Sequence, residues 1–309
     1  MAPTRTGVEV GGRHLVLSNL DKVLYPGSGF TKGEVIDYYA RVAQVMLPHL
    51  VGRPATRKRY PDGVGSAEFF EKNAPRHTPD WVRTVTIDSP GSTKNRETID
   101  YIVVDDLPTL VWLANLAALE LHVPQWRVAD DGAPLEADLV VIDLDPGPPA
   151  TVVECCQVAQ LVRETLATRE WGGLEVWAKT SGSKGLQLYV PISATPAERS
   201  SAFAKLLAQY LEREHPDLVV SRMTKALRPG KVLLDWSQNN AAKTTVAAYS
   251  LRAREQPSVS TPVSWDEVAG CRGADQLTFL AMDVLERVER HGDLLSPLGS
   301  VRQRLPQVL

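Results

Sequence analysis

The chain has 309 residues, enough for one large core or two packed subdomains, and its content of 43% hydrophobic and 23% charged residues is ordinary for a globular protein. It has no long uncharged apolar run of the kind that crosses a membrane, and its start, MAPTRTGVEVGG, lacks the apolar core of a signal peptide. These features exclude a membrane-spanning protein and predict a cytoplasmic one, whereas the formal net charge of −3 does not by itself indicate binding to nucleic acid.

The first predicted element is a helix over residues 32–47. Thr31 and Glu34 have the spacing of a capping box, and apolar residues recur behind them at helical intervals. A basic run, RPATRKR, follows at residues 53–59. A second helix is predicted over residues 108–119, and we expect it to be buried because it is nearly apolar throughout.

The second half of the chain alternates predicted strands and helices. In chain order, we expect a strand at 139–144, a helix at 151–167, strands at 174–179 and 186–192 joined by the turn TSGSKG, a helix at 197–214 and a strand at 231–236. This mixture, with its apparent hairpin, predicts an α/β or α+β fold with a mixed sheet flanked by helices. The polar stretch ADDGAPLE is the predicted boundary between an N-terminal subdomain, 13–135, and a catalytic core, 136–309, that share a cleft.

The cysteines limit the chemistry of any metal site. Cys155 and Cys156 are neighbours in a predicted helix and Cys271 is remote, so no disulfide framework or cysteine-rich zinc site can be built. A catalytic metal would therefore be held by oxygen or by histidine.

Aspartates close two of the predicted strands. Asp143 and Asp145 end the run LVVIDLD, and their side chains should share one face because side chains alternate along a strand. Asp235 ends the run KVLLD, and a third carboxylate beside the first two would complete a site for two divalent ions such as Mg²⁺ or Mn²⁺. The alternative is a surface turn in which Asp-Pro-Gly only ends a strand.

The turn TSGSKG at residues 180–185 offers two hydroxyls, a lysine and backbone amides freed by glycine, which are the parts of a phosphate cradle. It lacks the spacing of a P-loop, and an ordinary hairpin turn with a solvent-exposed lysine is the alternative. His122 could donate a hydrogen bond to a phosphate or could be a satisfied core histidine. Phe69 and Phe70 could stack on bases or could belong to the core.

Basic residues cluster despite the negative total charge. Residues 221–254 carry seven lysines and arginines against a single acid, Asp235, and the run at 53–59 adds a second basic segment. Each segment alone is compatible with a solvated face. Two such segments flanking a carboxylate cluster favour a phosphate-rich ligand.

Taken in order, the motifs DKVLYP, RPATRKR, FFEK, ALELHVPQW, VVIDLDPG, TSGSKG, MTKALRPGKVLLDWSQN, YSLR and HGDLL resemble the polymerase domain of bacterial ligase D, a member of the archaeo-eukaryotic primase superfamily. The resemblance covers nearly the whole chain and implies a single primase-polymerase catalytic domain over residues 1–309. It implies a mixed central sheet, part of it similar to an RNA-recognition motif, with flanking helices.

The resemblance also implies the activity: template-directed addition of nucleotides, with ribonucleotides often preferred, to 3′ ends at gaps and breaks during non-homologous end joining. The implied cofactor is Mn²⁺, or Mg²⁺, and the substrates are nucleoside triphosphates. The implied partners are DNA ends and gapped duplexes with a 5′-phosphate, a Ku-type end-binding protein and a DNA ligase. The implied location is the cytoplasm, in association with the nucleoid.

Site residues follow from the same resemblance, position by position. The metal-binding and catalytic acids match Asp143, Asp145 and Asp235. The positions that contact the incoming nucleotide match Lys58, Phe70, His122, Ser181, Ser183, Lys184, Gln187, Arg228, Gln238 and Arg252. The positions on the DNA side match Lys22, Lys32, Arg57, Arg59 and Phe69, with Lys22 and Lys32 in a pocket for the 5′-phosphate across a gap.

One position departs from the superfamily pattern. Where the superfamily usually has a histidine two residues after the glycine of the turn motif, this chain has Gln187, which can hydrogen-bond a phosphate or ribose but carries no charge. We therefore expect altered nucleotide affinity, or a different balance between gap filling and priming, with activity retained.

Other classes of function remain open from the residues alone. A metal-dependent phosphodiesterase or sugar-nucleotide transferase could use Asp143 and Asp145, and a catalytically silent DNA-end-bridging module would need only the basic segments. A ligase is excluded because the K-x-D-G motif of its nucleophilic lysine does not occur. We expect either a free-standing polymerase or one module of a longer ligase.

Overall fold

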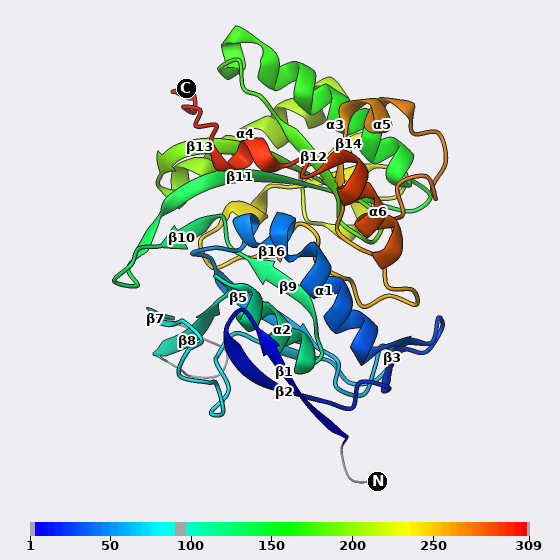
Figure 1. Ribbon diagram of the computed structural model, residues 1–309. Coiled ribbons are helices and arrows are strands. Elements are labelled where there is room, and N and C mark those ends of the chain that lie inside the picture. The colour runs from blue at the N-terminus through cyan, green and yellow to red at the C-terminus, as the bar shows by residue number, and fades with distance from the viewer. Residues whose placement is uncertain (1–3, 90–96, 308–309) are drawn as a thin grey trace.

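The computed structural model describes residues 4–89 and 97–307, which contain two large sheets and two small hairpins (Figure 1). Residues of both large sheets line a shared cleft. The larger sheet has the order β14 (Val219–Val220), β15 (Val232–Asp235), β11 (Pro134–Pro146), β13 (Leu186–Thr195), β12 (Trp177–Thr180) and β17 (Pro262–Val263), with β10 (Trp126–Val128) also paired to β11. The smaller sheet has the order β16 (Thr245–Val246), β9 (Ala118–Val123), β5 (Pro54–Arg59), β8 (Thr98–Val103) and β7 (Thr84–Asp88), with β6 (Phe69–Glu71) paired to β5.

The remaining elements cover these sheets or extend from them. The helices are α1 (Lys32–Met46), α2 (Leu107–Asn115), α3 (Val152–Ala167), α4 (Ala197–Glu214), α5 (Trp265–Gly270) and α6 (Ala281–His291). Two hairpins near the N-terminus are β1 (Arg5–Val10) with β2 (Arg13–Ser18), and β3 (Val23–Tyr25) with β4 (Phe30–Thr31). Short 3₁₀ turns occur at Leu47–His49, Arg169–Trp171, Lys225–Leu227, Trp236–Asn239 and Ser296–Gly299.

The larger sheet is mixed, as the sequence predicts, because β14 runs parallel to β15 while its other pairs are antiparallel. Helices α3 and α4 cover one face, where they bury alternate residues of β11 and β13 (Figure 1). Val140, Ile142 and Leu144 point into this core. The residues between them therefore point to the opposite face, toward the cleft.

The smaller sheet packs on α1 and α2 and shares its core with the C-terminal segment. The hydroxyl of Tyr39 on α1 donates to the carbonyl of Leu119 on β9 over 2.7 Å, and Tyr38 donates to the carbonyl of Tyr249 over 2.8 Å. Helix α6 contacts α1, and β16 pairs with β9. Segments from the C-terminal part of the chain thus complete the smaller sheet and its core. We call this half of the molecule the N-terminal lobe, and the larger sheet with α3 and α4 the second lobe.

Most predicted elements are confirmed. Helix α1 begins at Lys32, directly after the cap residue Thr31 and with Glu34 in its first turn, and α4 spans the predicted residues 197–214. The turn TSGSKG joins β12 to β13 as a hairpin. Of the stretch 129–136, residues 129–133 form the turn between β10 and β11 and residues 134–136 begin β11, so the predicted boundary lies between two paired strands of one sheet.

Two predicted elements are wrong in extent. The buried helix expected at 108–119 ends at Asn115, and the chain then turns through Ala117, whose φ is 58°, into β9. A buried central strand and a buried helix have similar apolar runs, so periodicity could not separate them. The strand expected at 174–179 begins only at Trp177. The strands β5 to β8 were not predicted, although apolar residues alternate along β7 and β8; β5 consists largely of a basic run, and β6 has only three residues.

Among the described residues, no helix is both long enough and apolar enough to cross a membrane.

Candidate active site

Strand alternation brings the first two aspartates to the cleft. Asp143 and Asp145 lie on β11 on the face opposite the core residues Ile142 and Leu144, as the sequence predicts. Asp143 is buried, whereas Asp145 at the strand end is exposed. The two carboxylates therefore share one edge of the cleft and differ in their access to water.

The third aspartate joins them through strand pairing. Asp235 ends β15 directly opposite Asp143, and one oxygen from each of Asp143, Asp145 and Asp235 lies within 4.8 Å of the others. The predicted three-carboxylate cluster is thus present in the structure. We call these three residues the carboxylate cluster.

The electrostatics of the cluster fit a cation. Burial and the nearby charges of Asp145 and Asp235 raise the pKa of Asp143 to about 8, although a hydrogen bond from Gln187 opposes the shift. Desolvation by the surrounding protein and the charge of Asp235 also raise the pKa of Asp145. Three carboxylates held this close repel one another, and oxygen ligands in this number suit Mg²⁺ or Mn²⁺. The residues therefore fit one or two divalent ions.

Neighbouring amides and hydroxyls orient two of the acids. Gln187 on β13 donates from Nε2 to Oδ1 of Asp143 over 3.0 Å. The backbone amide and the hydroxyl of Ser237 donate to Oδ1 of Asp235 over 3.0 and 2.6 Å, and Gln238 donates to its Oδ2 over 2.8 Å. These donors fix each carboxylate without neutralising its charge.

The turn TSGSKG is held by its own serine. Ser181 Oγ accepts hydrogen bonds from the backbone amides of Ser183 and Gly185 over 3.3 and 3.1 Å, while Ser183 and Lys184 are exposed at the cleft. Gly182 has φ +66°, and an added Cβ would lie 2.7 Å from the backbone of Val259 and Ser260. Only glycine fits that position, so the turn has a fixed shape.

The smaller sheet forms the opposite wall with a charged network. His122 Nε2 lies 2.8 Å from Oε2 of Glu120, and Arg252 Nε lies 3.3 Å from Oε1 of the same carboxylate. Arg252 also donates to the carbonyl of Ser181 over 2.5 Å and so ties this wall to the turn. Burial lowers the pKa of His122, although Glu120 opposes that shift. Sequence reasoning missed Glu120, whose signal was its place two residues before His122 on one face of a strand.

These groups line an open cleft of about 520 Å³. Its walls include Asp143 and Asp145 of the carboxylate cluster and the turn TSGSKG, together with basic residues of the segment 221–254. The residues that line it are His122, Asp143, Asp145, Pro146, Ser181, Ser183, Lys184, Gln187, Arg228, Gln238, Thr244, Thr245, Val246, Arg252 and Arg254. Carboxylates and basic groups that line one cleft suit a polyphosphate that is bound together with cations.

Lys58 and Phe70 extend the wall of the smaller sheet. Lys58 on β5 lies directly opposite Glu120 on β9 and Phe70 on β6, so these three side chains share a face. Lys58 pairs with Glu68 over 2.8 Å, and the Phe70 side chain is half exposed. Phe69 is also exposed but points to the other face of β6, because neighbouring residues of a strand alternate.

The two arginines predicted to contact DNA also point away from Lys58. Arg57 is fully buried and donates to the carbonyl of Asn73 over 2.8 Å, and Arg59 pairs with Glu71 over 2.9 Å. In this structure Arg57 is not available to DNA. Side chains alternate along β5, so Arg57 points to the face opposite Lys58 and into the interior. The prediction that Arg57 contacts DNA is therefore corrected to a structural role.

Lys22 and Lys32 lie together at the start of α1. Lys32 donates from Nζ to the carbonyl of Ser18 over 2.6 Å, and Lys22 pairs with Asp62 over 2.8 Å. Burial and the nearby charges of Lys22 and Arg59 lower the pKa of Lys32 to about 8. Positive charge therefore gathers at a helix N-terminus, an arrangement that favours a phosphate.

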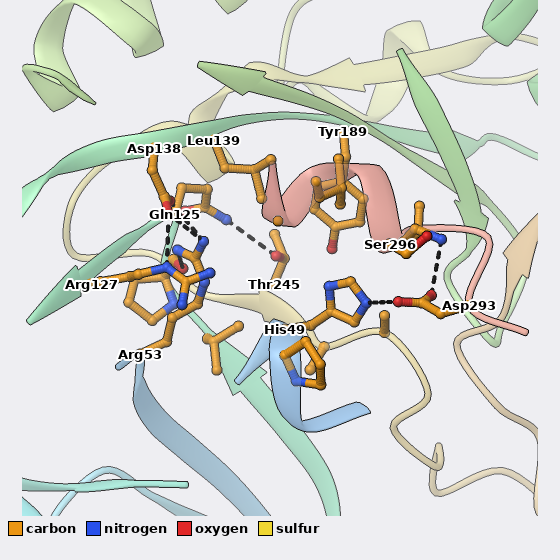
Figure 2. A pocket seen from close by; sticks show the side chains of 18 residues that line it. His49, Arg53, Gln125, Arg127, Asp138, Leu139, Tyr189, Thr245, Asp293 and Ser296 are labelled. Atoms are coloured by element: carbon orange, nitrogen blue, oxygen red, sulfur yellow. Dashed lines mark hydrogen bonds and ion pairs between the residues drawn. The ribbon is translucent and has the colours of Figure 1, made fainter. Parts of the chain in front are cut away.

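A second, more enclosed cavity of about 260 Å³ lies between the lobes and shares Thr245 with the cleft (Figure 2). Its polar groups are tied to one another: Arg53 and Arg127 clamp Asp138, Gln125 donates to Thr245, and His49 contacts Asp293. These pairs join residues of both lobes and of the C-terminal segment. The pair of Arg53 and Asp138 ties the residue before β5 of the smaller sheet to β11 of the larger sheet.

Comparison with known proteins gives consistent matches. The family described as "LigD, primase-polymerase domain" matches residues 31–295. The multifunctional non-homologous end joining protein LigD of Mycolicibacterium smegmatis is 48% identical over 286 residues, which is 92% of this chain and 36% of that protein. The bifunctional non-homologous end joining protein LigD of Bacillus subtilis is 33% identical over 280 residues, which is 90% of this chain and 43% of that protein. The chain thus spans less than half the length of these relatives.

A solved structure is similar over almost its whole length. The polymerase domain of Mycobacterium tuberculosis ligase D, determined in complex with DNA, superposes with a TM-score of 0.86 at 44% sequence identity. The match covers 93% of this chain and 99% of that one.

Proposed function

The chain belongs to the LigD primase-polymerase domain family, and from this premise we propose that it is a template-directed nucleotidyltransferase acting on DNA ends. It would add nucleotides to 3′ ends at gaps and breaks during non-homologous end joining. The whole chain would act as one catalytic domain, with residues 13–135 and 136–309 as its two subdomains.

One observation carries this proposal, namely the convergence of three carboxylates beside a preformed phosphate-binding turn. Asp143, Asp145 and Asp235 come within 4.8 Å of one another at a cleft that also offers Lys184 on the turn and Arg252 on the opposite wall. Nucleotidyl transfer needs this combination, because its substrate is a polyphosphate and its transition state gathers negative charge.

The carboxylate cluster would hold two divalent ions, Mn²⁺ by preference or Mg²⁺. When bound, the ions would supply positive charge that favours ionisation of the primer 3′-hydroxyl and offsets the charge of the leaving pyrophosphate. The 3′-hydroxyl would lose its proton to solvent, and its oxygen would bond to the α-phosphorus of the nucleotide while the bond to pyrophosphate breaks. The protein's own contribution is to hold the acids in place and to align the two substrates.

The other predicted residues would bind the nucleotide. Backbone amides of the turn, with Ser183 and Lys184, would hold the phosphates, and Arg252 and His122 would face them from the opposite wall. Lys58 and Phe70 would lie toward the sugar and base. Ser181, Gln187, Arg228 and Gln238 would complete this set, because each of them lines the cleft.

Residues outside the cleft would bind the DNA. Lys22 and Lys32, at the start of α1, would receive the 5′-phosphate on the far side of a gap. Phe69 would lie beside the template, and Arg59 would add charge near Lys32. We further propose a preference for ribonucleotides, and cooperation with a Ku-type end-binding protein and a DNA ligase.

Extension of a primer-template with nucleoside triphosphates and Mn²⁺ tests the activity. Growth of the primer is the expected result, whereas shortening of the primer or transfer of a sugar would indicate another class of enzyme. Asp145→Ala should abolish extension and keep DNA binding, which would exclude a silent bridging module. A wild-type protein that never extends the primer would refute the proposal.

Gapped duplexes test the DNA side and the choice of nucleotide. Extension with ribonucleotides and deoxynucleotides, compared side by side, measures the sugar preference. Lys22→Ala and Lys32→Ala should weaken the preference for a 5′-phosphorylated gap and spare simple primer extension. Equal activity of the wild type on phosphorylated and unphosphorylated gaps would remove the pocket assignment.

A further inference from the structure

A row of four polar residues crosses the larger sheet, one from each of four neighbouring strands. Lys179 on β12 lies directly opposite Gln187 on β13, which lies opposite Asp143 on β11, which lies opposite Asp235 on β15. Residues directly opposite one another in neighbouring strands point to the same face. The row therefore runs along the cleft face and ends at the carboxylate cluster.

Lys179 stands at the far end of this row and is fully buried. Its ammonium donates to Oε1 of Gln187 over 2.6 Å, to the hydroxyl of Ser260 and to the carbonyl of Thr180 over 3.5 Å. The Ser260 hydroxyl gives its own hydrogen to the Thr180 carbonyl over 2.9 Å, so it can only accept from Lys179. The ammonium is thus held by acceptors on separate segments.

A buried lysine is costly, and an apolar side chain would fill the same space without that cost. Its nearest acid along the row is Asp143, which it reaches only through Gln187. Burial lowers the pKa of Lys179, and the charge of Asp143 opposes that shift. The lysine and the aspartate are therefore coupled across one intervening amide.

The chemistry of the amide makes this coupling directional. Gln187 has an oxygen that only accepts and a nitrogen that only donates. Because Lys179 donates to the oxygen, the nitrogen faces Asp143 and donates to its Oδ1 over 3.0 Å. A flipped amide would set the nitrogen against the ammonium and the oxygen against the carboxylate, and both contacts would be repulsive.

We propose that Lys179 is a positioning residue for the carboxylate cluster. By fixing the amide of Gln187, it holds one oxygen of Asp143 and leaves the carboxylate pre-oriented to bind a divalent cation. Gln238 orients the carboxylate of Asp235 in the same way, because its side-chain amide donates to Oδ2 of that residue. The inference rests on the proposed function only in taking the cluster to bind a divalent cation.

If Lys179 acted only through its charge, replacing it would change the cation affinity of the carboxylate cluster in the opposite direction. Removing a positive charge near three carboxylates would strengthen their attraction for a cation. Removing a positioning group would weaken binding, because the carboxylate would then have to be ordered by the cation itself. Cation affinity therefore separates the two roles.

The test measures Mn²⁺ binding to the metal-free protein without nucleotide or DNA, by the electron paramagnetic resonance signal of free Mn²⁺. Lys179→Met should bind Mn²⁺ about tenfold more weakly than the wild type, the lower end of the range for groups that orient metal ligands. Gln187→Met should lose at least as much. Lys205→Met, the same chemical change at an exposed residue of α4, should leave the affinity unchanged.

The double variant decides whether Lys179 acts through Gln187. In the Gln187→Met background, Lys179→Met should cause no further loss of Mn²⁺ affinity, because the amide that connects Lys179 to Asp143 is already absent. Additive losses would overturn the proposal, as would a Lys179→Met protein that binds Mn²⁺ as tightly as the wild type or more tightly. A wild-type protein that binds no Mn²⁺ would overturn it as well.

Circular dichroism and thermal unfolding check that each variant is folded. If Lys179→Met does not fold, Ser260→Ala replaces it, since that change removes an acceptor that holds the ammonium and leaves the strands intact. Ser260→Ala should weaken Mn²⁺ binding in the wild-type background and have no effect in the Gln187→Met background, and any other pattern would overturn the proposal. A wild type that binds Mn²⁺ but extends no primer would refute the proposed function and not this inference.

Discussion

Replacing Gly182 by alanine should damage the phosphate-binding turn more than a glycine substitution elsewhere. Gly182 has φ +66°, which costs an L-residue about 1 kcal/mol. Its new Cβ would also lie 2.7 Å from backbone atoms of Val259 and Ser260, which cannot move as a flexible side chain could. Overpacking of this kind costs about 1 to 3 kcal/mol, so we expect Gly182→Ala to lose about 2 to 4 kcal/mol of unfolding free energy.

Gly12→Ala is the matched control. Gly12 has φ +75° in the turn between β1 and β2, and an added Cβ would meet no atom within 4 Å. This variant bears the backbone strain without the clash, and it should lose about 1 kcal/mol or less. Urea unfolding of both variants measures the difference between them.

Nucleotide binding gives the second measurement on the same pair. The hydroxyl of Ser258 donates to the Gly182 carbonyl over 2.7 Å and Arg252 donates to Ser181, so a displaced turn loses its anchors. Gly182→Ala should bind a nucleoside triphosphate at least tenfold more weakly, and Gly12→Ala should bind it normally. Equal stability losses in the two variants, with nucleotide affinity unchanged in both, would refute the reasoning.

Further predictions concern charge. Asp145→Asn removes one of three mutually repelling carboxylates, so the metal-free protein should gain up to about 1 kcal/mol of unfolding free energy in urea. The same variant should lose primer extension. A loss of stability would contradict the repulsion. The pKa of Lys32 is lowered to about 8, so the preference for a 5′-phosphorylated gap should fall as the pH rises through 8. The free energy of unfolding should rise with pH from about 8 toward the ordinary lysine pKa, because in that range the unfolded chain binds a proton that the folded chain has lost. A preference that stays constant from pH 7 to 9 would remove Lys32 from the pocket. Glu120→Gln should cost about 2 kcal/mol or more and raise the KM for nucleotide, because His122 and Arg252 lose their shared carboxylate; an unchanged KM would contradict this coupling. DNA affinity should fall steeply between low and physiological salt, since lysines and arginines displace condensed counterions, and a flat response would argue against phosphate-dominated binding.

The local features of this protein could be predicted from its sequence. The capping box at Thr31 begins a helix, and the run ending in Asp143 and Asp145 is a strand that turns both carboxylates to one face. These results depend on residues a few positions apart, whose spacing fixes their relation. The same reasoning failed at residues 116–119, where an apolar run passes from helix to strand without a change of composition.

The family resemblance supplied what local patterns could not. It indicated His122, Lys58 and Arg252 for the nucleotide site, and the structure brings His122 and Arg252 to one carboxylate, Glu120, with Lys58 directly opposite that residue on the neighbouring strand. It also indicated Arg57 for DNA, which strand alternation turns into the interior. A matching motif names a position, but the sheet decides which way its side chain points.

By itself, the sequence determined that Asp143 and Asp145 share a face and that a glycine-rich turn separates two strands. Only the tertiary structure decided that Asp235 lies opposite Asp143, and that Lys179 and Gln187 continue the same row. The reason is that strand order and register are set by burying both faces of the sheet at once, against α3 and α4 on one side and the second lobe on the other. No local spacing encodes that choice, so the carboxylate cluster and the lysine that orients it exist only in the folded chain.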